Sequence, residues 1–174
     1  MDFSRDHFAL FGLPVSYKLD AARLDQAYRD LQSEVHPDKF AQAGEAEQRL
    51  SMHWATRVNE AYQTLKRPFE RADYLLRLQG IHAMDAGNNA MPMEFLMHHM
   101  ELSEELADAR VARDGVVLDR LEKDLRREAR ELQARLAEEI DGQRNYPQAA
   151  ETLRKLRFTD KLLAEVGAAY EEIG

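Results

Sequence analysis

The sequence predicts an all-α protein that consists of an antiparallel helical hairpin with short flanking helices, followed by a three-helix bundle. Apolar residues recur every three or four positions through most of the 174 residues, and no stretch alternates apolar and polar residues as a strand would. Most of the eight glycines and five prolines lie between these periodic segments, where they end or open helices. An apolar fraction of 44% is enough for a folded core.

Composition and charge exclude several functional classes. The absence of cysteine excludes a disulfide framework, a thiolate metal site and a cysteine nucleophile. No apolar run of about 18 residues occurs and the first residues lack the charge of a targeting peptide, so we expect a cytoplasmic protein. Residues 1–80 hold 11 basic and 12 acidic side chains, whereas residues 81–174 hold 13 and 20. The acidic second half argues against nucleic acid as a ligand and indicates different partners for the two halves.

The first half predicts a short helix over Asp6–Leu10 and a pair of packed helices over Asp20–Val35 and Glu45–Leu65. Pro68 is expected to open a further short helix. The apolar stripes of the paired helices are Leu24, Tyr28, Leu31 and Val35 on one, and Leu50, Trp54, Val58, Ala61, Tyr62 and Leu65 on the other. The residues expected to close this core are Phe3, Phe8, Leu10, Phe11, Leu13, Phe69, Tyr74 and Leu75, with Phe40 either in the core or exposed.

Between the paired helices lies the segment His36-Pro37-Asp38-Lys39-Phe40. Pro37 cannot continue the preceding helix, because its ring blocks the previous turn and it donates no N–H. His36 and Asp38 are therefore expected on a loop at the tip of the hairpin. Rigid helices would hold these two polar groups ready to contact another molecule.

The hairpin resembles the J-domain, the module by which co-chaperones stimulate the ATPase of DnaK-family chaperones. The resemblance rests on the His-Pro-Asp segment and on Asn59–Leu65, followed by Pro68, Arg71, Ala72 and Tyr74. It implies the chaperone-binding residues His36, Pro37, Asp38, Lys39, Arg23 and Arg29. One departure is that acids alternate with the basic residues of the helix before the segment: Lys18, Arg23 and Arg29 with Asp20, Asp25, Asp30 and Glu34. We therefore expect weaker electrostatic docking, or a larger part for Lys39.

The second half begins with a polar segment over residues 79–92, which we interpret as a linker between a J-domain over 1–78 and a bundle over 93–174. Three helices are expected, over Met93–Arg113, Val116–Ile140 and Ala149–Ile173, and short connections make them an antiparallel bundle. The middle helix has one apolar seam: Leu118, Leu121, Leu125, Ala129, Leu132, Leu136 and Ile140.

The first and last bundle helices each carry apolar residues outside the core stripe. On the first helix the core stripe is Phe95, His99, Leu102 and Leu106, whereas Leu96, Met97 and Met100 lie roughly 100–200° away from Phe95. Glu101, Glu104 and Asp108 lie beside them. On the last helix Phe158 points away from the arc of Leu156, Leu163, Val166 and Tyr170. The pattern predicts an exposed apolar patch with an acidic margin, in which methionines suit an adaptable binding surface. Leu96 could instead belong to a wide core stripe.

These segments resemble the second domain of the HscB family, the J-type co-chaperones of bacterial iron–sulfur cluster assembly. The matching segments are Phe95-Leu96-Met97, Met100-Glu101-Leu102, Glu104-Glu105-Leu106, and Arg154–Phe158 with Asp160-Lys161-Leu162. With the N-terminal Phe-Gly-Leu-Pro and the His-Pro-Asp segment, the resemblance covers nearly the whole chain. It implies that the J-domain engages the chaperone HscA and that the bundle binds the cluster scaffold IscU. The implied scaffold-binding residues are Leu96, Met97, Met100, Glu101, Glu104, Asp108 and Phe158.

We expect no catalytic, cofactor or metal site in this chain. His36 and Asp38 are not accompanied by a Gly-x-Ser-x-Gly turn, and no Gly-rich phosphate loop occurs, so the ATPase would belong to the partner. His98 and His99 do not share a helix face, as metal ligands spaced by four would. Two alternatives remain: a general J-type holdase that presents unfolded clients through the methionine-rich patch, and a hydrolase with an unrecognised His/Asp site.

Overall fold

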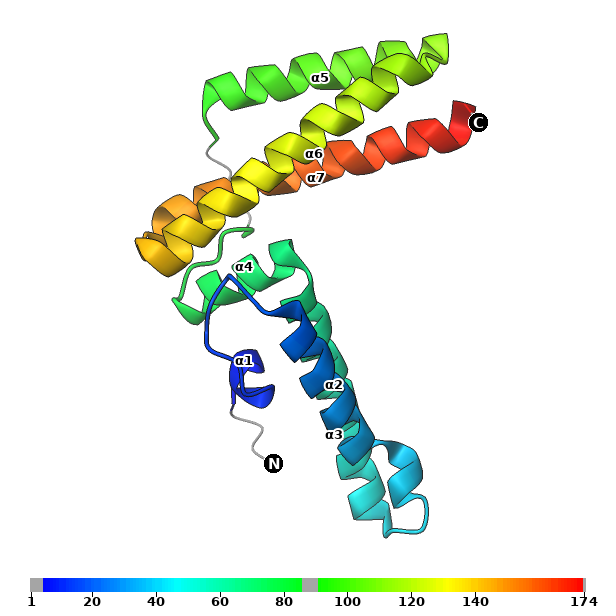
Figure 1. Cartoon of the computed structure of the whole chain (residues 1–174), viewed down its shortest axis with the longest axis vertical. Coiled ribbons are helices and arrows are strands. Elements are labelled where there is room, and N and C mark those ends of the chain that lie inside the picture. The colour runs from blue at the N-terminus through cyan, green and yellow to red at the C-terminus, as the bar shows by residue number, and fades with distance from the viewer. Residues whose placement is uncertain (1–4, 86–90, 174) are drawn as a thin grey trace. The chain divides into compact units, whose positions relative to one another are not determined.

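The computed structural model describes residues 5–85 and 91–173, and no strand occurs within these ranges (Figure 1). The prediction of an all-α protein is therefore confirmed. The predictions for Phe3 and for residues 86–90 of the linker lie outside the described residues. The chain divides into two compact units, Met1–Leu75 and Leu76–Gly174. Within the described ranges, none of the helices has both the length and the apolar character that a membrane span requires.

The first unit is built on an antiparallel helical hairpin. Helices α2 (Ala21–Val35) and α3 (Glu45–Lys66) lie side by side, and the short 3-10 helix η1 (Pro37–Phe40) lies at the tip (Figure 1). The short helix α1 (His7–Leu10) packs on α3, and α4 (Pro68–Leu78) follows α3 after a break at Arg67. The Asp20 carboxylate begins α2, because it accepts a hydrogen bond of 3.1 Å from the Arg23 N–H.

The core of the first unit follows the predicted stripes near the base of the hairpin and departs from them near the tip. Trp54 is buried as predicted, but Leu31 is only half-buried. Leu50 was predicted to be buried, and this is wrong because its side chain is 49% exposed. The inward position is taken by Ser51, whose hydroxyl donates a 2.8 Å hydrogen bond to the Val35 carbonyl. Phe40 was expected either in the core or exposed, and it is half-buried at the end of η1.

The second unit contains three long helices. Helices α5 (Met93–Ala112), α6 (Gly115–Ala137) and α7 (Tyr146–Ile173) contact one another in all three pairs, and α6 packs most extensively on α7 (Figure 1). Every residue of the predicted α6 seam is buried. Burying one leucine contributes about 1.5–3 kcal/mol, so this seam stabilises the bundle. The side chains that form one end of the core are Leu106, Ala109, Leu118, Leu121, Leu125, Leu162, Val166 and Ala169.

Three helix boundaries in the bundle differ from the prediction, and one of them is the end of α6, at Ala137 and not at Ile140. Gly115 was expected to separate α5 from α6, but it is the first residue of α6 because the Asp114 carboxylate accepts from the N–H groups of Val116 and Val117. The chain turns instead at Arg113, which has a φ of 54°. Helix α7 begins at Tyr146, earlier than expected, because Pro147 falls in its first turn, where a missing N–H costs no hydrogen bond. A single π turn, η2 (Glu138–Gly142), follows α6.

Candidate functional site

The His-Pro-Asp segment lies between α2 and α3, where the loop was expected, and its last two residues belong to the 3-10 helix η1. His36 has the extended backbone that a following proline favours, with φ of −60° and ψ of 128°, and Pro37 opens the 3-10 helix η1. The His36 Nδ1 atom accepts a 3.2 Å hydrogen bond from the Asp38 N–H. In this arrangement the neutral ring carries its hydrogen on Nε2, where it can be donated to a partner. The side chains of His36 and Asp38 are 50% and 91% exposed, so both are available for contact.

Two cationic side chains lie close to the His36 ring at this turn. Arg29, His36 and Lys39 line a shallow hollow of about 440 Å³ together with Gln32 and Ser33. Within residues 5–85 and 91–173, Lys39 makes no ion pair, and Arg29 donates only to Gln26 at 2.8 Å. The hollow is therefore a positive surface suited to an acidic partner.

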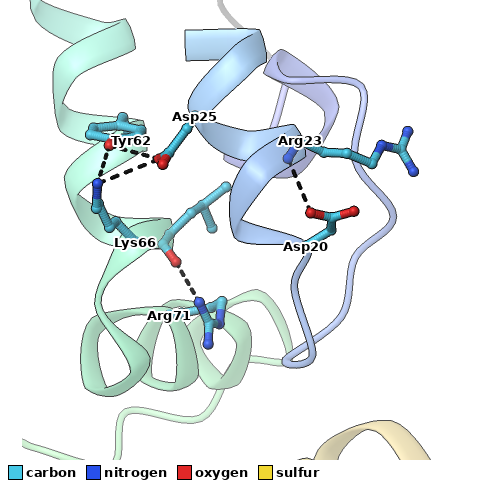
Figure 2. A network of polar contacts seen from close by, with 7 residues as sticks. Asp20, Arg23, Asp25, Tyr62, Lys66 and Arg71 are labelled. Atoms are coloured by element: carbon cyan, nitrogen blue, oxygen red, sulfur yellow. Dashed lines mark hydrogen bonds and ion pairs between the residues drawn. The ribbon is translucent and has the colours of Figure 1, made fainter.

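Arg23 does not share this surface with the other predicted chaperone-binding residues. It lies six residues before Arg29, which is about 240° around the helix. Its guanidinium points away from the neighbouring polar network (Figure 2). If Arg23 contacts the same partner, it does so from another face of α2.

The acids of α2 are largely engaged inside the first unit. Asp20 caps the helix, and Asp30 accepts a 2.8 Å hydrogen bond from the Gln26 amide. Asp25 accepts a 2.8 Å hydrogen bond from the Tyr62 hydroxyl and lies 3.4 Å from Lys66 Nζ (Figure 2). The Tyr62 hydrogen bond, with the Lys66 cation, holds the pKa of the Asp25 carboxyl below its usual range. Among the described residues, Asp25 is the acid of this helix that forms an ion pair, so Lys66 compensates one of the negative charges seen in the sequence.

The other residues that carry the J-domain resemblance hold the unit together. Arg71 donates a 2.7 Å hydrogen bond to the Leu65 carbonyl at the end of α3 (Figure 2) and lies 5.0 Å from the Tyr17 ring centroid. The Tyr74 hydroxyl accepts a 3.0 Å hydrogen bond from the His7 N–H, and the two rings stack at 4.2 Å. These contacts join α4 to α3 and α1, so Arg71 and Tyr74 hold α4 against the base of the hairpin.

A second candidate site lies on the bundle, where α5 and α7 leave apolar side chains exposed. Met97, Met100 and Phe158 are 55%, 62% and 44% exposed. Leu96 is half-buried, which is intermediate between the exposed patch and the core stripe. Leu96, Met100 and Phe158 line one hollow of about 320 Å³ between the two helices. Met97 does not line it. A hollow of this kind can accept an apolar side chain of a partner protein.

The three predicted acids lie exposed along α5 and do not line the hollow. Glu101, Glu104 and Asp108 make no ion pair within the described ranges. Their neighbour Glu105, in contrast, pairs with Arg120 of α6. The three carboxylates therefore form an uncompensated negative margin beside the apolar side chains, which favours a partner with basic groups.

Sequence reasoning missed five of the eight residues that line this hollow. They are His99, Ser103, Lys161, Leu162 and Glu165, of which His99 was predicted only as a core residue. The α7 members follow Phe158 by three, four and seven positions and so share its helix face. That spacing could have indicated these three residues in the sequence. The hollow itself is formed with α5, so it could not be predicted from α7 alone.

Comparisons with known proteins match both units. A family model described as the DnaJ domain matches residues 6–74, and one described as the HSCB C-terminal oligomerisation domain matches residues 91–167. The chain is 44% identical over 173 residues to a co-chaperone protein HscB homolog of Azoarcus sp. (strain BH72), covering 99% of this chain and 98% of the relative. It is 47% identical over 167 residues to the homolog of Paraburkholderia phymatum, covering 96% and 95%.

Solved structures agree with these matches. The chaperone HscB from Vibrio cholerae superimposes with a TM-score of 0.87 at 38% identity, covering 98% of this chain and 100% of that one. The human co-chaperone protein HscB superimposes with a TM-score of 0.90 at 31% identity, covering 97% and 83%. The helices of both units thus have counterparts in these structures.

Proposed function

The chain belongs to the HscB family of J-domain co-chaperones, and on this premise we propose that it binds the iron–sulfur cluster scaffold IscU and delivers it to the DnaK-family chaperone HscA. In the same step it stimulates the ATPase of HscA, and so supports the maturation of iron–sulfur proteins. The chain itself is not an enzyme in this proposal, because ATP is bound and hydrolysed by the chaperone.

The observation that carries the proposal is the presence of two unlike exposed sites on two compact units. The first unit presents an ordered His-Pro-Asp turn beside the cationic side chains of Arg29 and Lys39. The second presents an apolar hollow with an uncompensated acidic margin. An adaptor that joins two proteins needs two such surfaces, each suited to a different partner chemistry.

At the first site, the turn would act by hydrogen bonding and charge. Pro37 fixes the backbone between α2 and η1, and the Asp38 N–H holds the His36 ring by its Nδ1 atom. The Nε2–H of His36 and the carboxylate of Asp38 are then presented to the chaperone in a fixed relation. Arg29 and Lys39 would attract an acidic surface of HscA to the turn.

At the second site, shape and charge would select a folded scaffold. One apolar side chain of IscU would enter the hollow beside Phe158, and basic groups of IscU would meet Glu101, Glu104 and Asp108. Desolvated apolar anchors contribute most of the affinity of such interfaces, whereas charges at the margin chiefly raise the association rate.

The substitution His36→Gln tests the proposal. It should leave the melting temperature and the affinity for IscU unchanged while it abolishes stimulation of the HscA ATPase, measured as phosphate release in single turnover. His82→Gln is the matched control, because His82 is also exposed but lies outside the turn. Stimulation that survives in His36→Gln would overturn the assignment of the turn as trigger.

A general holdase is the second candidate function, and the exposed methionines favour it. Met93, Met97 and Met100 are 70%, 55% and 62% exposed, and flexible thioethers adapt to varied apolar partners. A holdase would bind chemically denatured proteins, whereas the adaptor would bind folded IscU. Competition between denatured protein and IscU for the purified chain separates the two.

A further inference from the structure

Beside the bundle hollow, polar contacts of Glu128 connect all three long helices. The imidazole of His99 on α5 is buried, with 7% exposed, and its Nε2 atom lies 3.0 Å from Oε1 of Glu128 on α6. The Thr159 hydroxyl on α7 lies 3.3 Å from the same oxygen. It is also 3.2 Å from the Lys155 carbonyl of its own helix, so it can donate to either acceptor. Glu128 is therefore the common acceptor for side chains of α5 and α7.

The His99 ring in turn contacts the aromatic residues that border the hollow. Phe95 stacks on it with ring centroids 4.2 Å apart. Phe158 meets both rings edge-on, at 6.3 Å from Phe95 and 6.5 Å from His99, with interplanar angles of 88°. Phe158 is also the residue directly before Thr159 in α7. Two contacts therefore restrain the Phe158 ring. His99 meets the ring directly, and the neighbouring Thr159 connects this part of α7 to Glu128.

The His99 imidazole and the Thr159 hydroxyl are buried, and the Glu128 carboxylate that they share is 23% exposed. Burying polar groups costs free energy that their mutual hydrogen bonds only partly return, and an apolar residue of similar size would often serve stability as well. The contact has a geometric effect that an apolar residue would not reproduce, because it fixes the orientation of the imidazole plane on which the two phenylalanines rest.

We propose that Glu128 is a positioning residue for scaffold docking. It acts through His99, and with Thr159 it fixes the Phe158 ring so that the hollow between α5 and α7 is already open to one apolar side chain of the folded scaffold. This inference rests on the proposed function, since it concerns the same surface. Preorganised binding surfaces gain affinity because less order is imposed when the partner binds.

A double-mutant cycle of Glu128→Leu and Phe158→Ala, measured by titration with IscU, tests the proposal. Glu128→Leu should weaken binding by about tenfold without a lower melting temperature, because leucine fills the space but cannot accept from His99. Glu128→Gln should bind within about twofold of the original chain, because its amide oxygen can still accept that hydrogen bond. In the Phe158→Ala background, Glu128→Leu should have no further effect. Glu131→Leu, an exposed position one turn later on α6, is the control.

Each outcome of the cycle decides the proposal. Additive losses, or a Glu128→Leu loss that follows a lowered melting temperature, would overturn the positioning role while scaffold docking at the patch stands. If Phe158→Ala alone leaves the affinity for IscU unchanged, docking at this patch fails and the inference fails with it. Should Glu128→Leu not fold, Thr159→Val replaces it in the same cycle, with a smaller loss expected and the same requirement that the loss vanish with Phe158→Ala.

Discussion

The Tyr62 hydroxyl on α3 donates a 2.8 Å hydrogen bond to the Asp25 carboxylate on α2 (Figure 2). Lys66, one turn after Tyr62, lies 3.4 Å from the same carboxylate oxygen, and its ammonium lies 4.9 Å from the centroid of the Tyr62 ring. Tyr28 stacks on the Tyr62 ring, with the two ring centroids 3.9 Å apart. The carboxylate is therefore held toward α3, and the negative charge that α2 would otherwise present is compensated within the hairpin.

Removing Lys66 should expose the charge of Asp25 and weaken chaperone docking. We expect Lys66→Met to raise the concentration needed for half-maximal stimulation of HscA about threefold at low salt, because an uncompensated acid then lies on the helix that approaches an acidic partner. The double variant Asp25→Asn/Lys66→Met, which restores the balance of charge, should return to the original value. Lys123→Met is the control, since it removes a paired lysine from the other unit. Equal stimulation by all of these variants would contradict the compensation.

Trp54 and Leu50 occupy neighbouring turns of α3 and should differ sharply in their effect on stability. Trp54 is 5% exposed and Leu50 is 49% exposed. Trp54→Ala should lower the free energy of unfolding by about 3–5 kcal/mol, enough to unfold the first unit at physiological temperature. Leu50→Ala should change it by less than about 0.5 kcal/mol. Urea denaturation followed by far-ultraviolet circular dichroism measures both, and similar losses would show that the hairpin tip is packed in solution.

The contrast between these two residues illustrates what periodicity can predict. The spacing of apolar residues correctly predicted the paired helices, the α6 seam and the burial of Trp54. It could not distinguish the covered base of a two-helix hairpin from its uncovered tip, because both have the same period. Leu50 lies near the tip, where Ser51 instead faces α2 and hydrogen-bonds the Val35 carbonyl.

The bundle site shows the same limit. Helical-wheel arithmetic indicated that Met97, Met100 and Phe158 would be exposed, because each helix has its own core arc. It could not show that Phe158 and Met100 line one hollow, or that Glu128 contacts His99 beside it, because the register between α5, α6 and α7 depends on tertiary packing. In the sequence, Glu128 is one of many arginine and glutamate residues on the solvated face of this helix, and its distance to His99 distinguishes it.

The acidic margin of α5 should act on the rate of association with the scaffold. We expect Glu101→Gln, Glu104→Gln and Asp108→Asn together to slow association with IscU about tenfold at low salt, and to change dissociation much less. The difference should shrink as salt is added, because the exposed charges are screened. Stopped-flow fluorescence measures both rates. Glu131→Gln, Glu138→Gln and Glu171→Gln, which remove the same charge from other exposed positions, should leave them unchanged. A loss carried mainly by dissociation would show direct, desolvated contacts.

Glu139 in the turn η2 should make the stability of the bundle fall as the pH rises. Its carboxyl is buried and accepts a 3.1 Å hydrogen bond from the Thr152 hydroxyl, but its Oε2 atom accepts none within the described residues. Burial raises the pKa of Glu139 above its usual value, against the opposing effects of the Thr152 hydrogen bond and of Arg135 and Lys155. The folded chain then binds more protons than the unfolded chain between the two pKa values.

The stability contributed by Glu139 is consequently complete below the unfolded pKa, near about 4.3, and is lost as the pH rises through the folded pKa. Glu139→Gln is neutral at every pH, so it should match the original chain near pH 4 and melt at a higher temperature than the original chain near pH 7. Differential scanning calorimetry across this range measures the difference. Glu138→Gln, at the exposed neighbouring position, should show no such divergence. A Glu139→Gln effect of the same size at both pH values would mean that the carboxyl stays charged in the fold, with its burial compensated.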